Sequence, residues 1–191
     1  MTKSDRRIRI ISGEFGGQRI STPKGIRPTT ERVREAIFSA QGDIGGLSVL
    51  DLYTGSGAFG LEAMSRGSAK TVLVEHNRNV AATCRENLES IDKQGRGRLV
   101  VSEVLTFLSG SPPPEAPFDL VCCDPPYEIA ATEIPLVLTN IAQPGWLTPD
   151  ARVVIEQAVA REFGEVTFPE GWITASERKY GGTIVVTLKL A

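Results

Sequence analysis

From residue 47 onward, short apolar segments alternate along the sequence with helical segments, and short loops join them. The apolar segments can bury side chains on both faces, as the strands of a parallel sheet do. Strands are predicted over residues 48–52, 71–75, 98–101, 120–123 and 152–156, and helices over residues 58–66, 78–90, 103–108 and 132–142. This alternation predicts a doubly wound α/β body.

The last two predicted strands, residues 172–179 and 183–190, depart from this rhythm. Only the stretch Tyr180-Gly-Gly182 separates them, which is typical of a β-hairpin and leaves no room for a crossover helix. The chain is therefore predicted to form a seven-stranded, mostly parallel sheet with a C-terminal antiparallel hairpin. That arrangement is the Rossmann-like fold of class I methyltransferases.

A glycine-rich loop follows the first strand of this body, in the stretch Asp51-Leu-Tyr-Thr-Gly-Ser-Gly-Ala-Phe-Gly60. Its glycines, Gly55, Gly57 and Gly60, match the G-x-G-x-x-G pattern of dinucleotide-binding loops. Glu75 ends the next predicted strand, where an acid accepts hydrogen bonds from ribose hydroxyls. A dinucleotide-dependent oxidoreductase is therefore one candidate.

The acid Asp51 favours a different ligand for the same loop. Three residues separate it from Gly55, whereas the first glycine of a pyrophosphate loop lies directly against the strand end. A carboxylate here would repel phosphate, but it suits S-adenosylmethionine, which carries an ammonium and a sulfonium and no phosphate. We expect S-adenosylmethionine to be bound by Asp51, Gly55, Gly57 and Glu75.

A further cofactor contact is expected after the third strand of the body, at Glu103. An acid or amide at this place and the next backbone N–H, that of Val104, usually meet the adenine. The alternative is that Ser102 caps a helix here and nothing else is implied. The only histidine, His76, follows Glu75 on a predicted loop, and we assign it no role.

The fourth strand of the body ends in the stretch Asp124-Pro-Pro-Tyr127. Prolines cannot donate to a sheet, so the strand must stop at Asp124, at the sheet edge where open α/β folds bind ligands. The Asp124 carboxylate and the Pro125 carbonyl can accept hydrogen bonds from the two N–H groups of an aromatic amine and so direct its lone pair at a methyl donor. Tyr127 can stack on an extruded base. A turn that happens to contain these residues is the alternative.

Basic residues are concentrated at the start of the chain. The first 40 residues hold nine Lys or Arg against four acids, a net charge of +5, whereas the remaining 151 residues carry −7. This asymmetry indicates either an anionic partner held at one end or a solvated tail. The candidate contacts lie on a predicted glycine-rich hairpin and on a helix that Thr30 can cap, with Val33, Ile37 and Ala40 on its apolar face. They are Arg7, Arg9, Arg19, Arg32 and Arg34.

The chain resembles the RsmD family, bacterial methyltransferases that modify a guanine N2 amino group in small-subunit ribosomal RNA. The resemblance covers essentially the whole chain and includes the glycine loop and Asp124-Pro-Pro-Tyr127. The stretches specific to this family are Arg9-Ile-Ile-Ser-Gly13 and Arg27-Pro-Thr-Thr-Glu-Arg-Val-Arg-Glu-Ala-Ile-Phe38. It implies 16S ribosomal RNA as the partner, within the 30S subunit or its precursor.

We therefore expect an RNA-binding extension over residues 1–40 and a methyltransferase domain over residues 41–191, acting as a monomer. The start of the chain has no signal-peptide pattern, and no apolar run is long enough for a membrane span, so a cytoplasmic protein is expected. Three cysteines and one histidine predict no metal site, and adjacent Cys122 and Cys123 are expected to be core thiols.

Three other classes of protein share part of this pattern. A DNA or other RNA amino-methyltransferase would use the same chemistry, but a DNA enzyme usually needs a sizeable recognition domain that this chain lacks room for. A protein glutamine methyltransferase favours Asn at the position of Asp124. A non-enzymatic RNA-binding module would not need both the Asp51 loop and the Asp124 motif.

Overall fold

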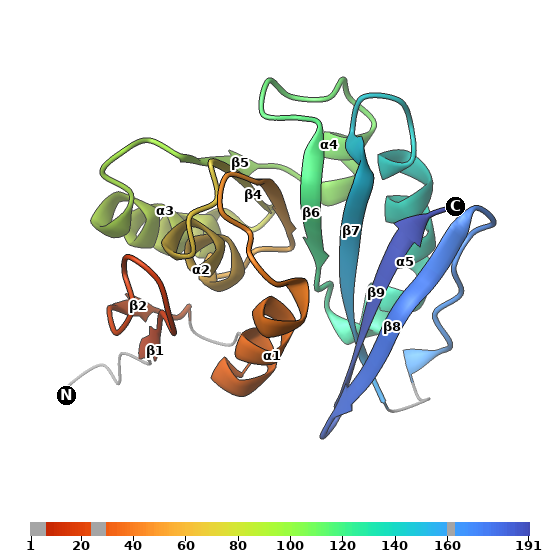
Figure 1. Ribbon diagram of the computed structural model, residues 1–191, viewed down its shortest axis with the longest axis horizontal. Helices are drawn as coiled ribbons and strands as arrows, with labels where there is room; N and C mark the ends of the chain where they lie inside the picture. The colour runs from red at the N-terminus through yellow and green to blue at the C-terminus, as the bar shows by residue number, and fades with distance from the viewer. Residues whose placement is uncertain (1–6, 24–29, 160–162) are drawn as a thin grey trace.

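The computed structural model describes residues 7–23, 30–159 and 163–191, and within them seven strands form one sheet in the order β5-β4-β3-β6-β7-β9-β8 (Figure 1). The strands of this sheet are β3 (Ser48–Leu52), β4 (Lys70–Glu75), β5 (Gly97–Val101), β6 (Phe118–Cys123), β7 (Leu147–Ala158), β8 (Trp172–Tyr180) and β9 (Thr183–Leu190). The helices are α1 (Glu31–Gln41), α2 (Ala58–Ser65), α3 (Arg78–Ile91), α4 (Val104–Leu108) and α5 (Tyr127–Ile141).

The pairing of these strands agrees with the predicted topology. Strands β3 to β7 pair in parallel, while β9 lies antiparallel between β7 and β8. The prediction of a mostly parallel sheet with a C-terminal antiparallel hairpin is confirmed, as is the class I methyltransferase arrangement.

Helices cover both faces of the sheet, because successive side chains of a strand point to opposite sides. On β3, Leu50 and Leu52 pack in a core with α4 and α5, whereas Val49 packs in a second core with α1 and α2. The central strands β3, β4 and β6 therefore contain few polar residues on either face, which is the reason that the sequence indicates their positions.

Two helices differ from the prediction. Helix α5 begins at Tyr127 rather than at residue 132. Pro126, which has extended backbone angles, lies just before the first helical turn, where backbone N–H groups have no partner within the helix and proline is therefore tolerated. In α1 the buried apolar residues are Val33, Ile37 and Phe38, while the predicted Ala40 is exposed. Thr30 caps α1 as expected, its hydroxyl accepting from the Val33 N–H.

The basic hairpin consists of β1 (Arg7–Arg9) and β2 (Arg19–Ser21), and it packs against α2 and α3. Its Ile10, Phe15 and Ile20 form a small core with apolar side chains of these helices. Gly13 has a φ of 82°, and a Cβ there would lie 1.8 Å from the Ser65 carbonyl oxygen, so only glycine allows this close approach. Arg27 and Pro28 of the family-like stretch lie outside the described residues.

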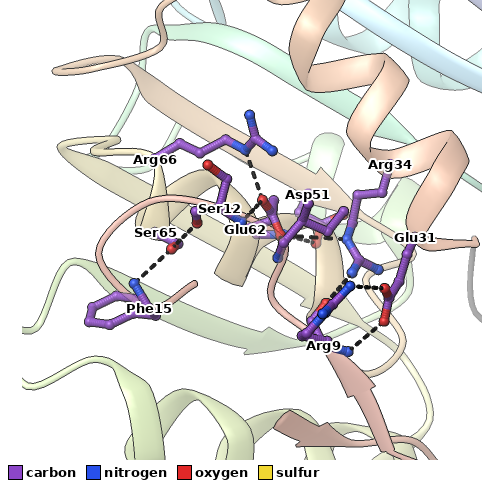
Figure 2. Close-up of polar contacts among 11 residues, drawn as sticks. Arg9, Ser12, Phe15, Glu31, Arg34, Asp51, Glu62, Ser65 and Arg66 are labelled. Carbon is purple, nitrogen blue, oxygen red and sulfur yellow. Dashed lines mark hydrogen bonds and ion pairs between the residues drawn. The ribbon is translucent and has the colours of Figure 1, made fainter. Parts of the chain in front are cut away.

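A fully buried carboxylate on α2, that of Glu62, anchors the hairpin (Figure 2). It accepts from the backbone N–H groups of Ile11 at 2.7 Å and Ser12 at 3.1 Å. It also accepts from Arg66 Nε at 2.8 Å, and Arg34 Nε lies 3.8 Å away. The Ser65 hydroxyl, one turn further along α2, accepts from the Phe15 N–H at 2.9 Å. The described part of the basic segment is therefore a packed element and not a solvated tail.

Replacing Glu62 with Met keeps much of the side-chain volume but leaves the two backbone amides and the two guanidinium groups without this carboxylate. We expect the free energy of unfolding to fall by about 3–5 kcal/mol, the usual effect of removing one partner of a buried ion pair. Urea denaturation measures this loss. The exposed Glu35 on α1 provides the control, and Glu35→Met should change stability by about 0.5 kcal/mol or less. A loss below about 1 kcal/mol in Glu62→Met would contradict the anchoring role.

Candidate functional site

The site lies outside the carboxyl ends of β3 and β6, which pair in parallel although two other strands separate them along the chain. The chain runs outward from β3 through β4 to β5 and then returns to form β6 on the other side of β3. A ligand crevice forms where the strand order reverses in this way. Because Leu52 pairs with Cys123, the glycine loop and the Asp124 motif leave the sheet side by side.

Asp51 is buried beneath the glycine loop and holds it in shape. Its carboxylate accepts from the Thr54 hydroxyl and, at 2.9 Å, from the Gly60 N–H. The pKa of Asp51 is raised to about 7, chiefly by burial and also by the negative charges of Asp124 and Glu75, while the two hydrogen bonds oppose the shift. The acid predicted to meet a cationic ligand is therefore also the group that organises the loop.

The loop contains three residues with left-handed backbone angles: Tyr53 at φ 59°, Gly55 at φ 57° and Gly57 at φ 84°. For Tyr53 this conformation costs about 1–2 kcal/mol, which glycine does not incur. The Tyr53 hydroxyl donates to the Glu133 carboxylate on α5. This contact connects the loop to the helix that follows the Asp124 motif, and no pattern in the sequence indicates either partner.

Glu75 ends β4 next to the loop, as predicted, with a side chain that is only 7% exposed. One carboxylate oxygen accepts from the Gly55 N–H at 3.1 Å, and the other accepts from the Asn77 N–H at 2.8 Å. The exposed His76 places Nδ1 3.4 Å from that second oxygen. The structure thus brings together Glu75 and Gly55, two of the predicted cofactor contacts.

Glu103 lies beyond the end of β5, at the start of α4, with an exposed side chain. The alternative of a Ser102 cap is wrong, because the Ser102 hydroxyl donates to the Glu103 carbonyl and not to the helix. The Ser102 N–H donates to the Glu75 carbonyl at 3.1 Å, so this loop lies against the end of β4. Val104 is the first residue of α4, so its N–H belongs to the first helical turn, where N–H groups have no partner within the helix.

The stretch Asp124-Pro-Pro-Tyr127 connects β6 directly to α5. Asp124 is half-buried and Pro125 is buried, while Tyr127 is the first residue of the helix. The Tyr127 hydroxyl lies 3.1 Å from the Thr183 hydroxyl at the start of β9, and its ring lies 5.8 Å from that of Phe163. The C-terminal hairpin therefore fixes the aromatic ring of the motif, a role that sequence reasoning did not assign to Thr183.

Three carboxylates, those of Asp51, Glu75 and Asp124, interact at this one edge of the sheet. A phosphate would add to their mutual repulsion, whereas a ligand with a positive charge would relieve it. This donor set fits the ammonium and sulfonium groups of S-adenosylmethionine. It disfavours the dinucleotide alternative, because a pyrophosphate would have to lie against the same loop.

Most of the predicted basic contacts are exposed, but one is not. Arg7, Arg19 and Arg32 are exposed, and the half-exposed Arg9 side chain pairs with Glu31 at 3.2 Å. Arg34 is 1% exposed, and its guanidinium donates to the Arg9 carbonyl (Figure 2). Burial lowers the pKa of Arg34, opposed by the charge of Glu62. The prediction that Arg34 contacts RNA is therefore wrong, because its side chain is part of the buried anchor.

The sheet order and the two loops at the β3–β6 edge define a class I methyltransferase. Residues 8–189 match the family model described as "Conserved hypothetical protein 95". The chain belongs to this family, the RsmD family expected from the sequence. It is 36% identical over 177 residues, 91% of this chain and 85% of the relative, to "Ribosomal RNA small subunit methyltransferase D" of Escherichia coli K12.

Solved structures agree with this assignment. The structure described as a putative methyltransferase yhhF from Escherichia coli has a TM-score of 0.84 and 32% identity, covering 97% of this chain and 98% of its own. SMU.776, a putative methyltransferase solved with S-adenosylhomocysteine, has a TM-score of 0.65 and 18% identity, covering 92% of this chain and 52% of its own. The second likeness concerns the fold alone.

No helix within the described residues is long and apolar enough to cross a membrane.

The pKa of Asp51 predicts a pH-dependent contribution to stability. Its pKa in the folded chain, about 7, lies above the ordinary value of 3.8, so folding is favoured by protonation of Asp51. This stabilisation is complete below about pH 4 and is lost as the pH rises through 7. Relative to Asp51→Asn, we expect the free energy of unfolding of the unsubstituted protein to fall by about 2 kcal/mol between pH 5 and pH 7.

Urea denaturation of both proteins from pH 5 to pH 8 measures this difference. The exposed Asp150 serves as the control, and Asp150→Asn should show no such trend. A difference between the unsubstituted protein and Asp51→Asn that stays constant over this range would mean that Asp51 is ionised throughout.

Proposed function

We propose that this protein transfers a methyl group from S-adenosylmethionine to the N2 amino group of a guanine in 16S ribosomal RNA. The observation that carries the proposal is the pairing of β3 with β6, which sets the glycine loop beside Asp124-Pro-Pro-Tyr127. The amino-group chemistry follows from that motif. The ribosomal substrate is supported by the family and by the exposed arginines of the hairpin.

The cofactor supplies an electrophilic methyl group on a sulfonium sulfur. We assign its ribose hydroxyls to the Glu75 carboxylate, which already accepts from the loop N–H of Gly55. The adenine is assigned to the Glu103 side chain and the Val104 N–H, since the loop that carries them lies against the end of β4. Gly55 and Gly57 let the loop backbone approach the ligand, and the buried Asp51 keeps that backbone in place.

The acceptor nitrogen needs help from the protein, because an aromatic amine delocalises its lone pair into the ring. The Asp124 carboxylate and the Pro125 carbonyl each accept a hydrogen bond from one of its two N–H groups. These hydrogen bonds draw the nitrogen toward tetrahedral geometry. The lone pair would then point at the methyl group for in-line displacement, in which the N–C bond forms as the S–C bond breaks. S-adenosylhomocysteine would leave, and the nitrogen would lose one proton to the Asp124 carboxylate. Tyr127 stacks on the extruded guanine, a contact that contributes about 1–3 kcal/mol. Its hydroxyl contact with Thr183 keeps the ring in position.

The substrate is proposed to be the 30S subunit or its precursor, and the site of action the cytoplasm, where that particle is assembled. The acidic body repels RNA, so the positive charge of the first 40 residues must supply the attraction. We assign RNA binding to Arg7, Arg9, Arg19 and Arg32 in the extension over residues 1–40, and catalysis to residues 41–191. A monomer suffices, because one chain provides the loop, the motif and the hairpin.

Asp124→Ala tests the catalytic assignment. We expect methyl transfer to fall about 100-fold or more, while S-adenosylmethionine binds nearly as well as before, because the carboxylate faces the amine. A tritium-transfer assay on small-subunit particles and calorimetry measure the two effects, with Asp150→Ala as the control. Mass spectrometry of 16S ribosomal RNA from a deletion strain should show loss of one N2-methylguanosine, which the wild-type gene restores and Asp124→Ala does not. A variant that retains more than about a tenth of the rate, a change of under 1.4 kcal/mol, would refute the assigned role.

The RNA-binding role of the extension over residues 1–40 is tested by removing three of its exposed charges, with Arg7, Arg19 and Arg32 all replaced by Ala. Each lost phosphate contact removes about 0.7 from the slope of log affinity against log salt, so the slope should flatten by roughly two units. The Michaelis constant for the particle should rise, and cofactor affinity should not change.

A matched variant removes three exposed lysines elsewhere on the described surface: Lys70, Lys93 and Lys189. This variant loses the same net charge, so comparing the two variants distinguishes local contacts with RNA phosphates from a general electrostatic effect. Equal salt slopes for the two triple variants would show that the extension over residues 1–40 does not bind RNA.

A further inference from the structure

One buried side chain connects the basic hairpin to the glycine loop. Asn87 lies on α3 and is 4% exposed. Its Oδ1 accepts from the Ser21 N–H at 2.9 Å, and its Nδ2 donates to the Ser21 carbonyl at 2.9 Å. The same Nδ2 donates to the Ser56 carbonyl at 2.8 Å. Ser21 is the last residue of β2, and Ser56 lies between Gly55 and Gly57 in the cofactor loop.

These three hydrogen bonds suit the chemistry of an amide. A side-chain amide offers two N–H donors and an acceptor, and here both donors and the acceptor are used. Asp would lose both donors, and an apolar residue would leave two carbonyls and one N–H without this partner, of which the Ser56 carbonyl contact is buried. The side chain is therefore a specific three-way connection and not simply a space-filling residue.

Each end of this connection lies next to groups that the proposed function uses. On the hairpin side, Ser21 pairs in register with Arg7 and lies two residues from Arg19, so its position sets the placement of both exposed arginines. On the loop side, the Gly55 N–H donates to Glu75, one residue before the carbonyl that Asn87 holds. A shift of either segment strains the bonds that Asn87 makes to the other.

The other polar anchors of the hairpin differ in this respect. The carboxylate of Glu62 and the hydroxyl of Ser65 bind hairpin backbone from α2, and neither has a hydrogen bond to residues 53–57 among those described. They hold the hairpin in place without contacting the loop. Among the side-chain hydrogen bonds described, those of Asn87 are thus the ones that join the two segments.

We propose that Asn87 is a positioning residue that couples RNA binding to cofactor binding, so that each ligand raises the affinity for the other. The inference rests on the function proposed above. A cofactor that orders the Gly55–Gly57 backbone fixes the Ser56 carbonyl, then the Asn87 amide, and then the end of β2. By linkage, RNA bound to the hairpin stabilises the loop by the same factor.

The test measures binding of S-adenosylhomocysteine to the full chain, with and without small-subunit particles from cells that lack the methylation. The unsubstituted protein should bind S-adenosylhomocysteine about fivefold or more tightly when the particles are present. In Asn87→Ala this ratio should fall to about one. Asn79→Ala, which alters an exposed residue of the same helix, should keep the full ratio. A ratio near one in the unsubstituted protein, or an unchanged ratio in Asn87→Ala, would overturn the coupling.

Hydrogen exchange of the unsubstituted protein provides a second test that needs no variant to fold. Saturating S-adenosylhomocysteine should slow exchange in residues 53–60 and also in residues 15–23, although the hairpin is assigned no cofactor contact. Protection of residues 53–60 alone would refute the coupling.

Methylation of the same particles by the unsubstituted protein distinguishes a failure of the proposed function from a failure of the coupling. If the particles are not methylated, the proposed function fails. If they are methylated while the affinity ratio stays near one, only the coupling fails.

Discussion

The parallel pairing of β3 with β6 is the constraint on which the site depends. It joins two segments that β4 and β5 separate along the chain, and it makes both end at the same edge of the sheet. Neither the glycine loop nor the Asp124 motif is a site by itself. Each strand is buried on both faces, so a slip in register would move apolar side chains out of both cores and is strongly disfavoured. The packing of the body therefore fixes the position of the glycine loop relative to the Asp124 motif.

Electrostatics at this edge act in the opposite direction to packing. The body gathers Asp51, Glu75 and Asp124 where their charges repel one another, and burial makes ionisation of Asp51 costly. Within the described residues, the glycine loop offsets part of this cost by donating N–H groups to Asp51 and Glu75. A ligand that carries positive charge completes the compensation. The carboxylates at this edge therefore favour a positively charged ligand.

The sequence predicted the sheet and the two motifs because their signals are local. Apolar runs, glycines and paired prolines occur within a few residues of one another, so the number of strands, the C-terminal hairpin and most boundaries could be predicted. The contacts between distant segments had no such signal. Charge alone could not distinguish a surface arginine from a buried one, and Arg34 was misassigned because its partner Glu62 lies on α2. Likewise, nothing near Asn87 or Glu133 in the chain indicates that they bind the hairpin and Tyr53.

The close contact at Gly13 limits how this architecture can be rearranged by recombination. The hairpin backbone approaches the end of α2 so closely that no side chain fits between them, and its amides rely on Glu62 and Ser65. The residues that receive the hairpin belong to the helices that follow the cofactor loop and β4. Transplanting the basic segment alone onto another methyltransferase would leave its amides without acceptors. The segment and its receiving helices form one structural unit, and a chimera that keeps the hairpin packed must exchange them together.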